Sequence, residues 1–252
     1  MSREEITPHR KIFVANWKMN GTSSFAEAYG AFFREKYQDV PKNTFTIICP
    51  PAPYLKILHD AAQGIVLLGI QNTATERKGA FTGEISADMA ADMGCRYGLV
   101  GHSERRHLYQ ENNTIVFEKA VRLAEAGITP ILCVGETYEQ REAGQTACIL
   151  AQQLQGMGRL PLTQEVIVAY EPVWAIGTGK TPTPQNVQET HRTIHAILRA
   201  EGLSAIPLLY GGSVTAANAK DFVSLEEVQG VLVGGASLKC EEFLSIVQSI
   251  EL

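Results

Sequence analysis

The chain has 252 residues, of which 45% are hydrophobic and 19% are charged, so it can bury a large core and is not globally disordered. Its net charge of −5 argues against non-specific binding to nucleic acid or membranes, but it leaves room for an anionic small-molecule substrate. The five cysteines are scattered and lack C-x-x-C spacing, which argues against a disulfide framework or a zinc site and favours a cytoplasmic location. No secretory signal is visible at the start, and no apolar run is long enough to span a bilayer.

Eight short apolar runs, rich in β-branched residues, recur along the chain. They occupy residues 12–15, 45–48, 65–68, 97–100, 131–134, 166–169, 207–210 and 230–233. Each run is apolar on both faces. That pattern is typical of a parallel strand that is covered by helices on both sides.

Segments with helical periodicity lie between these runs. They occupy residues 23–37, 53–63, 111–126, 144–157, 184–200, 215–223 and 238–250. Repeated right-handed strand–helix units close into a barrel, so we predict an α/β fold, a single-domain (β/α)8 barrel over residues 1–252 with an N-terminal extension at 1–10. A doubly wound open sheet is the alternative.

Polar residues and glycines cluster directly after the predicted strands. Those that could carry chemistry are Asn16, Lys18, His102, Glu104, Glu171, Gly211, Gly212, Ser213, Gly234 and Gly235. In a parallel barrel these strand ends meet on one face, where barrel enzymes place their active sites. We therefore expect residues distant in sequence to share one site.

Taken singly, these residues allow plainer interpretations. Glu171 follows an apolar run and precedes a glycine-rich stretch, which suits a base beneath a lid, but it also suits a carboxylate on a solvated edge. Lys18 could be a solvated lysine and His102 a structural histidine. The glycine pairs could form tight turns or bring backbone N–H groups to a phosphate. The nucleotide-binding glycine patterns and H-E-x-x-H are missing from the sequence, which argues against a nucleotide or a metal.

Several segments, taken in chain order, together resemble the triosephosphate isomerase family. They are residues 16–20, 71–72, 79–84, 101–106, 133–136, 170–180, 210–213 and 234–237. The resemblance extends over essentially the whole chain after Arg10. It implies an enzyme that interconverts dihydroxyacetone phosphate and D-glyceraldehyde 3-phosphate through a cis-enediolate.

The resemblance also implies catalytic roles. Glu171 is expected to move the carbon-bound proton, and His102 to act as a neutral electrophile whose pKa is lowered by a short helix that begins near Ser103. Lys18 would offset the negative charge on the enediolate and the phosphate, and Asn16 would donate a hydrogen bond to a substrate oxygen. Glu104 is expected to relay protons or to position Lys18, although a purely structural role is the alternative.

Further expectations concern the phosphate, the lid and a partner. The resemblance implies that backbone N–H groups of Gly177, Ser213, Gly234 and Gly235 hold the phosphate, and that neither a metal nor an organic cofactor is needed. A lid at residues 172–180 would exclude water, with Tyr170, Glu136 and Trp174 as its anchors. The loop 71–84, which runs from Gln71 to Glu84, would interdigitate with a second copy and bring Thr82 near the neighbouring site, so we expect a homodimer.

Two positions depart from the family pattern. Pro182 stands where alanine is usual, at the third residue of the C-terminal hinge of the lid, and Cys240 stands where proline is frequent. In the family, a tyrosine hydroxyl matching Tyr210 bonds to the N–H of that hinge residue. Proline lacks this N–H, so we expect closure of the lid to depend more on the contact of Ser213 with the backbone of Gly179 than on Tyr210.

Two other functions stay open at this stage. The chain could isomerise a related sugar phosphate such as a tetrulose phosphate, because such an enzyme could keep every motif. It could also be a non-catalytic binding protein on the same fold, although the presence of Asn16, Lys18, His102, Glu104 and Glu171 argues against that.

Overall fold

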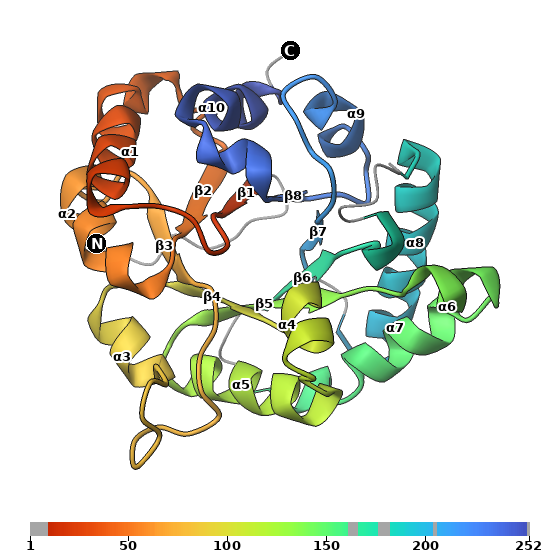
Figure 1. Cartoon of the computed structure of the whole chain (residues 1–252). Coiled ribbons are helices and arrows are strands. Elements are labelled where there is room, and N and C mark those ends of the chain that lie inside the picture. Colours follow the sequence, from red (N-terminus) through yellow and green to blue (C-terminus); the bar gives the residue numbers. More distant parts are fainter. Residues whose placement is uncertain (1–9, 161–165, 176–181, 204–205, 251–252) are drawn as a thin grey trace.

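The computed structural model describes residues 10–160, 166–175, 182–203 and 206–250, and these form a closed barrel of parallel strands (Figure 1). Neighbouring strands pair in chain order, and β1 pairs with β8 to close the ring. The strands are β1 (Lys11–Asn16), β2 (Thr44–Cys49), β3 (Leu67–Ile70), β4 (Tyr97–Val100), β5 (Thr129–Val134), β6 (Ile167–Tyr170), β7 (Leu208–Tyr210) and β8 (Gly230–Val233). Closure confirms the predicted (β/α)8 barrel and rules out the open doubly wound sheet.

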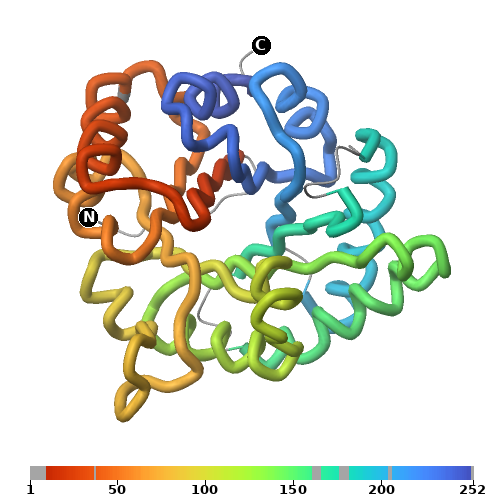
Figure 2. The backbone as a smooth tube through the Cα atoms, in the orientation of Figure 1, coloured from red at the N-terminus to blue at the C-terminus, as the bar shows by residue number. Residues whose placement is uncertain are grey.

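The helices surround the barrel as an outer ring (Figures 1 and 2). They are α1 (Ser23–Glu35), α2 (Leu55–Ala62), α3 (Ala87–Asp92), α4 (Ser103–Leu108), α5 (Asn113–Glu125), α6 (Tyr138–Glu142), α7 (Thr146–Leu154), α8 (Pro184–Ala200), α9 (Ala219–Val223) and α10 (Cys240–Gln248). Within the described ranges, none of these helices is long and apolar enough to cross a membrane.

The core has two layers, because successive residues of a strand face opposite sides of the sheet. Along β1, Ile12 and Val14 belong to the cluster inside the barrel, whereas Phe13 and Ala15 pack in the layer between the barrel and the helices. Burial on both faces explains why the strand runs are apolar throughout rather than alternating.

The structure differs from the predicted elements at several boundaries. Strand β3 starts two residues later than predicted, since Gln63 and Gly64 turn the chain with φ of 50° and 80° and Ile65 N–H bonds back to the carbonyl of Ala62. Helices α3 and α6 were not predicted. Helix α9 starts at Ala219 rather than at residue 215, because residues 215–218 form a capped turn.

Candidate active site

His102 is positioned by the junction of β4 and α4. It is the N-cap residue of α4, and its Nδ1 accepts the backbone N–H of Glu104 at 3.2 Å. A ring nitrogen that accepts a hydrogen bond carries no proton, so the proton of the neutral ring lies on Nε2. That atom lies 3.0 Å from Oε1 of Glu171. The imidazole therefore presents a donor to the interior of the site.

Glu171 follows β6 directly and is buried, with 4% of its surface exposed. Its second carboxylate oxygen, Oε2, accepts the backbone N–H of Ser103 at 2.9 Å. The backbone here lies very close to Gly135, where a Cβ atom would fall 1.7 Å from the carbonyl oxygen of Glu171. Only glycine fits at position 135, so the loop after β5 helps to set where Glu171 lies.

The two buried groups shift each other's protonation. Burial disfavours the charged form of Glu171, but the neighbouring His102, helped by the N–H of Ser103, outweighs burial and lowers the pKa of this carboxyl. Burial likewise disfavours the imidazolium, yet the carboxylates of Glu171 and Glu104 outweigh it and raise the pKa of His102. The predicted lowering of the pKa of His102 is therefore not seen in this arrangement, because the carboxylate contact dominates over the start of the helix.

Lys18 is held in an uncommon backbone conformation with φ of 54°. Its N–H donates to Oδ1 of Asn16 at 3.0 Å, and its carbonyl accepts Nε2 of Gln71 at 2.9 Å. The ammonium group lies 2.6 Å from Oε1 of Glu104. Left-handed backbone at a lysine persists only where surroundings impose it, so Asn16, Gln71 and Glu104 together fix this side chain. Gln71 was predicted only as part of a matching segment and as the start of the loop 71–84, so its contact with Lys18 is new.

These residues border a cavity of about 310 Å³ at the carboxyl ends of the strands. Asn16, Lys18, His102 and Glu171 form one side of the lining, and the glycine-rich loops after β7 and β8 form another, with residues 211–215, Leu232, Gly234, Gly235 and Ala236. Lys18 is the only lysine or arginine among the described residues that line it. In the described part of the chain, no group of three or more His, Cys, Asp or Glu is placed to hold a metal ion.

The structure thus brings most of the predicted site residues together. Glu104 reaches the site through its contact with Lys18 rather than by lining the cavity. Gly177 and Gly179 lie outside the described residues, as does most of the predicted lid.

The described start of the lid is anchored on Glu136, whose side chain is fully buried. One of its oxygens, Oε1, accepts Tyr170 Oη at 3.1 Å, Trp174 Nε1 at 3.1 Å and Arg141 Nη1 at 2.9 Å. The guanidinium of Arg141 also lies over the Trp174 ring, 5.0 Å from its centroid. Tyr170, Glu136 and Trp174 are predicted anchors, whereas Arg141 carried no sequence signal.

Comparison with known proteins agrees with this geometry. The sequence profile described as "Triosephosphate isomerase" matches residues 11–250. A protein of that name from Marinobacter nauticus is 44% identical over 247 residues, which cover 95% of this chain and 97% of the relative. A protein of the same name from Aquifex aeolicus is 45% identical, and the match covers 95% of this chain and 99% of the relative. Another from Chlamydia trachomatis is 44% identical, and the match covers 97% of this chain and 92% of the relative. The chain therefore belongs to the triosephosphate isomerase family.

Proposed function

We propose that this chain interconverts dihydroxyacetone phosphate and D-glyceraldehyde 3-phosphate through a cis-enediolate. The observation that carries the proposal is the pairing of Glu171 with His102 at 3.0 Å on the wall of a cavity whose other side is glycine-rich backbone. A carboxylate and an imidazole donor side by side suit the removal of a proton next to a carbonyl while the carbonyl oxygen is polarised.

Glu171 acts as the base in this proposal. Its lowered pKa keeps the carboxylate ionised at neutral pH, ready to accept the carbon-bound proton. In the structure, both carboxylate oxygens contact other groups, one the N–H of Ser103 and the other Nε2 of His102. The side chain must therefore leave at least one of these contacts to reach the substrate.

His102 acts as the neutral electrophile, donating from Nε2–H to the substrate oxygens. The neighbouring Glu171 carboxylate is the leading influence that raises the pKa of His102. When that carboxylate turns to the substrate, burial, the N–H donated to Nδ1 and the charge of Lys18 remain and favour the neutral ring, and Glu104 is the carboxylate that still opposes them.

Lys18 and Asn16 stabilise the negative charge that develops on the substrate. Glu104 positions Lys18 in this proposal, because it contacts the ammonium at 2.6 Å, whereas its approach to Nδ1 of His102 is 3.7 Å, beyond hydrogen-bond distance. The phosphate is held by backbone N–H groups of Ser213, Gly234 and Gly235, together with Gly177. No metal or organic cofactor is required, since the carbonyl of the substrate itself acidifies the proton.

We infer a homodimer through the loop 71–84, with Thr82 near the partner's site. The loop between β3 and α3 projects from the barrel (Figure 1), and large apolar side chains are exposed on it and on other segments. They are Phe81 on this loop and Met19, Met89, Leu108, Tyr109 and Tyr138 elsewhere. Exposed apolar side chains of this size favour burial against a partner.

We also infer one domain over residues 1–252, with 1–10 as an extension, because the family match spans 11–250. Five free cysteines, three of them buried, favour a reducing cytoplasm. Binding of nucleic acid or membranes is not part of the proposal, in keeping with the net charge of −5.

A related four-carbon sugar phosphate is the second candidate substrate. The cavity of about 310 Å³ lies at the small end of the range for ligand sites, roughly 300–1,000 Å³, and its volume admits either substrate. A coupled assay with both substrates tests this. We expect the larger kcat/KM on the triose phosphate. Greater turnover of the four-carbon substrate would assign the chain to it, and no turnover of either would leave a binding protein on this fold.

A further inference from the structure

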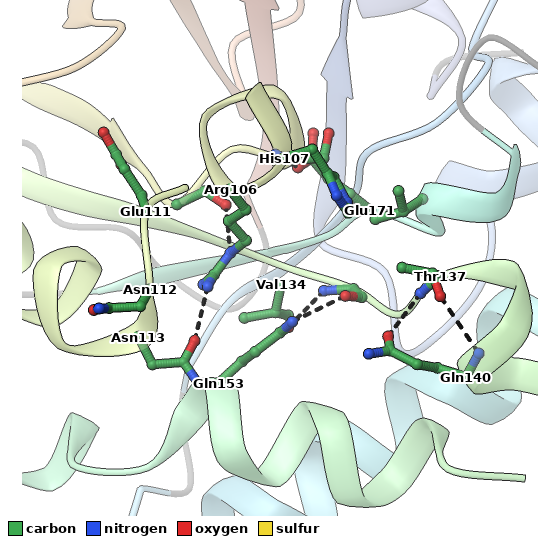
Figure 3. A pocket seen from close by; sticks show the side chains of 14 residues that line it. Arg106, His107, Glu111, Asn112, Asn113, Val134, Thr137, Gln140, Gln153 and Glu171 are labelled. Carbon is green, nitrogen blue, oxygen red and sulfur yellow. Dashed lines mark hydrogen bonds between the residues drawn. The ribbon is translucent and has the colours of Figure 1, made fainter. Parts of the chain in front are cut away.

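Glu171 lines both the substrate cavity and a second cavity of about 260 Å³, which we call the rear cavity. Figure 3 shows the side chains that line the rear cavity. Its walls come from α4, the start of α5, the loop after β5, and helices α6 and α7. Apart from Glu171, it shares no lining residue with the substrate cavity. The proposed isomerisation assigns no role to this space.

Arg106 extends into this region and carries a charge without a close carboxylate partner. Its Nε donates to the carbonyl of Gly101 at 2.8 Å, Nη1 to Oδ1 of Asn113 at 2.8 Å and Nη2 to the carbonyl of Cys133 at 3.2 Å. All three acceptors are uncharged. Among the described residues, no carboxylate oxygen lies within ion-pair distance of Arg106, and burial lowers the pKa of this guanidinium.

A guanidinium has five N–H donors, so these three bonds leave two N–H groups of Arg106 available. Arg106 is half-buried, and burying a cation costs free energy unless an anion or hydrogen-bond acceptors compensate it. A small anion in the adjoining cavity would supply the missing charge and two acceptors.

A second donor lies on the other side of the rear cavity. Gln140 accepts the N–H of Thr137 with Oε1 at 2.9 Å, and it turns its amide nitrogen toward the middle of the cavity (Figure 3). No described residue accepts a bond from that nitrogen. Gln153 lies between them, and its amide oxygen accepts the N–H of Gly135 at 2.7 Å while its nitrogen donates to the Gly135 carbonyl at 3.0 Å, which leaves one further N–H on that nitrogen.

The local charge balance also favours an anion. Glu111 on the cavity wall is paired with Arg105 at 2.6 Å and with Lys119 at 2.5 Å. With Arg106 and Glu171 included, this region holds three cations and two carboxylates, and of the three cations Arg106 is the one that lines the cavity. His107 lies exposed at the rim.

We propose that the rear cavity binds a small carboxylate anion, of the size of formate or acetate, between the guanidinium of Arg106 and the amide of Gln140. Charge-assisted bonds from a guanidinium to a carboxylate are among the strongest in proteins, and here they would use the N–H groups that Arg106 leaves free. The volume also leaves space for a few waters, each of which occupies about 30 Å³.

The test is saturation-transfer NMR from the protein to the methyl group of acetate. Gln140→Glu replaces the donor by a negative charge but keeps an oxygen for the Thr137 N–H, as in a glutamate capping box, so α6 should persist. We expect acetate affinity to fall about tenfold. Gln38→Glu, on an exposed turn after α1, matches the charge change and should bind like the unaltered protein. Circular dichroism confirms that each variant is folded.

Two further variants test whether acetate binds in the rear cavity or in the substrate cavity. Asn113→Asp gives Arg106 a carboxylate partner from within the chain and should also weaken acetate binding. Gly235→Asp adds negative charge to the substrate cavity and should leave acetate binding intact. The proposal is overturned if the unaltered protein gives no acetate signal, which would mean that the rear cavity holds only water. It is equally overturned if the signal is lost in Gly235→Asp but survives in Gln140→Glu and Asn113→Asp.

Discussion

The catalytic end of the barrel and the layer between barrel and helices handle buried polar groups differently. At the catalytic end, Glu171 and His102 contact each other, and Lys18 is paired with Glu104. In the layer, some polar side chains are buried without an ion pair. His191 on α8 bonds through Nδ1 to the carbonyl of Glu227 at 2.9 Å, and its Nε2 has no partner among the described residues.

The two buried histidines show how this difference affects the pKa of a buried side chain. His102 and His191 are 6% and 0% exposed, so both are removed from water. The pKa of His102 is nevertheless raised, because carboxylates outweigh burial, whereas burial lowers the pKa of His191 to about 4. Neighbouring charge therefore decides the protonation of a buried histidine here, rather than depth alone.

The strongest test of the paired arrangement is Glu171→Asp. Shortening the side chain moves the carboxylate by roughly 1 Å, and such misplacement of a reacting group can cost about 100-fold in rate. We expect kcat/KM to fall by at least that factor with the fold intact. The pKa of His102, followed by NMR, should fall as well, since its carboxylate neighbour withdraws. Near-normal turnover of the pure variant would remove Glu171 from the role of base.

The isolated histidine predicts acid sensitivity. Its pKa is about 4 in the folded protein and about 6.5 in the unfolded chain, so between these values the unfolded chain binds a proton that the folded protein does not. The stability contributed by the neutral ring is thus present above pH 6.5 and is lost as the pH falls toward 4. Because His191 titrates in this way, the free energy of unfolding should fall by about 2 kcal/mol when the pH is lowered from 7 to 5.

His191→Asn isolates this contribution, since the asparagine amide can still donate to the Glu227 carbonyl but does not titrate. Urea unfolding of both proteins at pH 7 and pH 5, at one protein concentration, gives the comparison. The variant is expected to lose about 2 kcal/mol less between the two pH values. If both proteins lose the same amount, then His191 is not the group responsible.

A smaller effect is expected at the glycine-rich side of the substrate cavity. A Cβ atom at Gly235 would meet no atom within 4 Å, so an aspartate fits and its charge acts alone. Inhibition by inorganic phosphate should weaken about tenfold in Gly235→Asp, because a carboxylate repels the anion. Gly235→Asn has nearly the same shape without the charge and should change little. Equal losses in both variants would point to shape instead of charge.

Site residues could be predicted from the sequence where the barrel topology alone brings them to the same face. Glu171 and His102 follow separate strands, and parallel closure brings such strand ends to one face, so they could be assigned together. Other contacts between elements carried no signal in the sequence. Gln71 reaches the carbonyl of Lys18 from 53 positions away, and Arg141 meets Trp174 only after α6 folds. The direction of the pKa shift of His102 depended on a 3.0 Å distance that no spacing in the sequence specifies.

The smallest effect is expected at Tyr210, another singly buried polar group. Its ring stacks on Phe222 with centroids 4.3 Å apart, and its hydroxyl has no partner among the described residues. Pro182 occupies the hinge position whose N–H would otherwise bond to this hydroxyl. It is buried and has no N–H. Removing a buried hydroxyl that lacks a partner costs little stability.

Two opposing effects on closure follow from Pro182. A missing hydrogen bond weakens the closed lid by about 0.5–1.5 kcal/mol, while a stiffer hinge recovers about 0.4–1 kcal/mol of entropy if its geometry suits closure. We therefore expect Tyr210→Phe to change kcat/KM less than twofold. Ser213→Ala alters a residue that lines the substrate cavity and should cost more, up to about tenfold. A loss in Tyr210→Phe as large as in Ser213→Ala would mean that the tyrosine hydroxyl has a partner in the closed lid after all, so Tyr210 would then belong with the paired groups of the catalytic end.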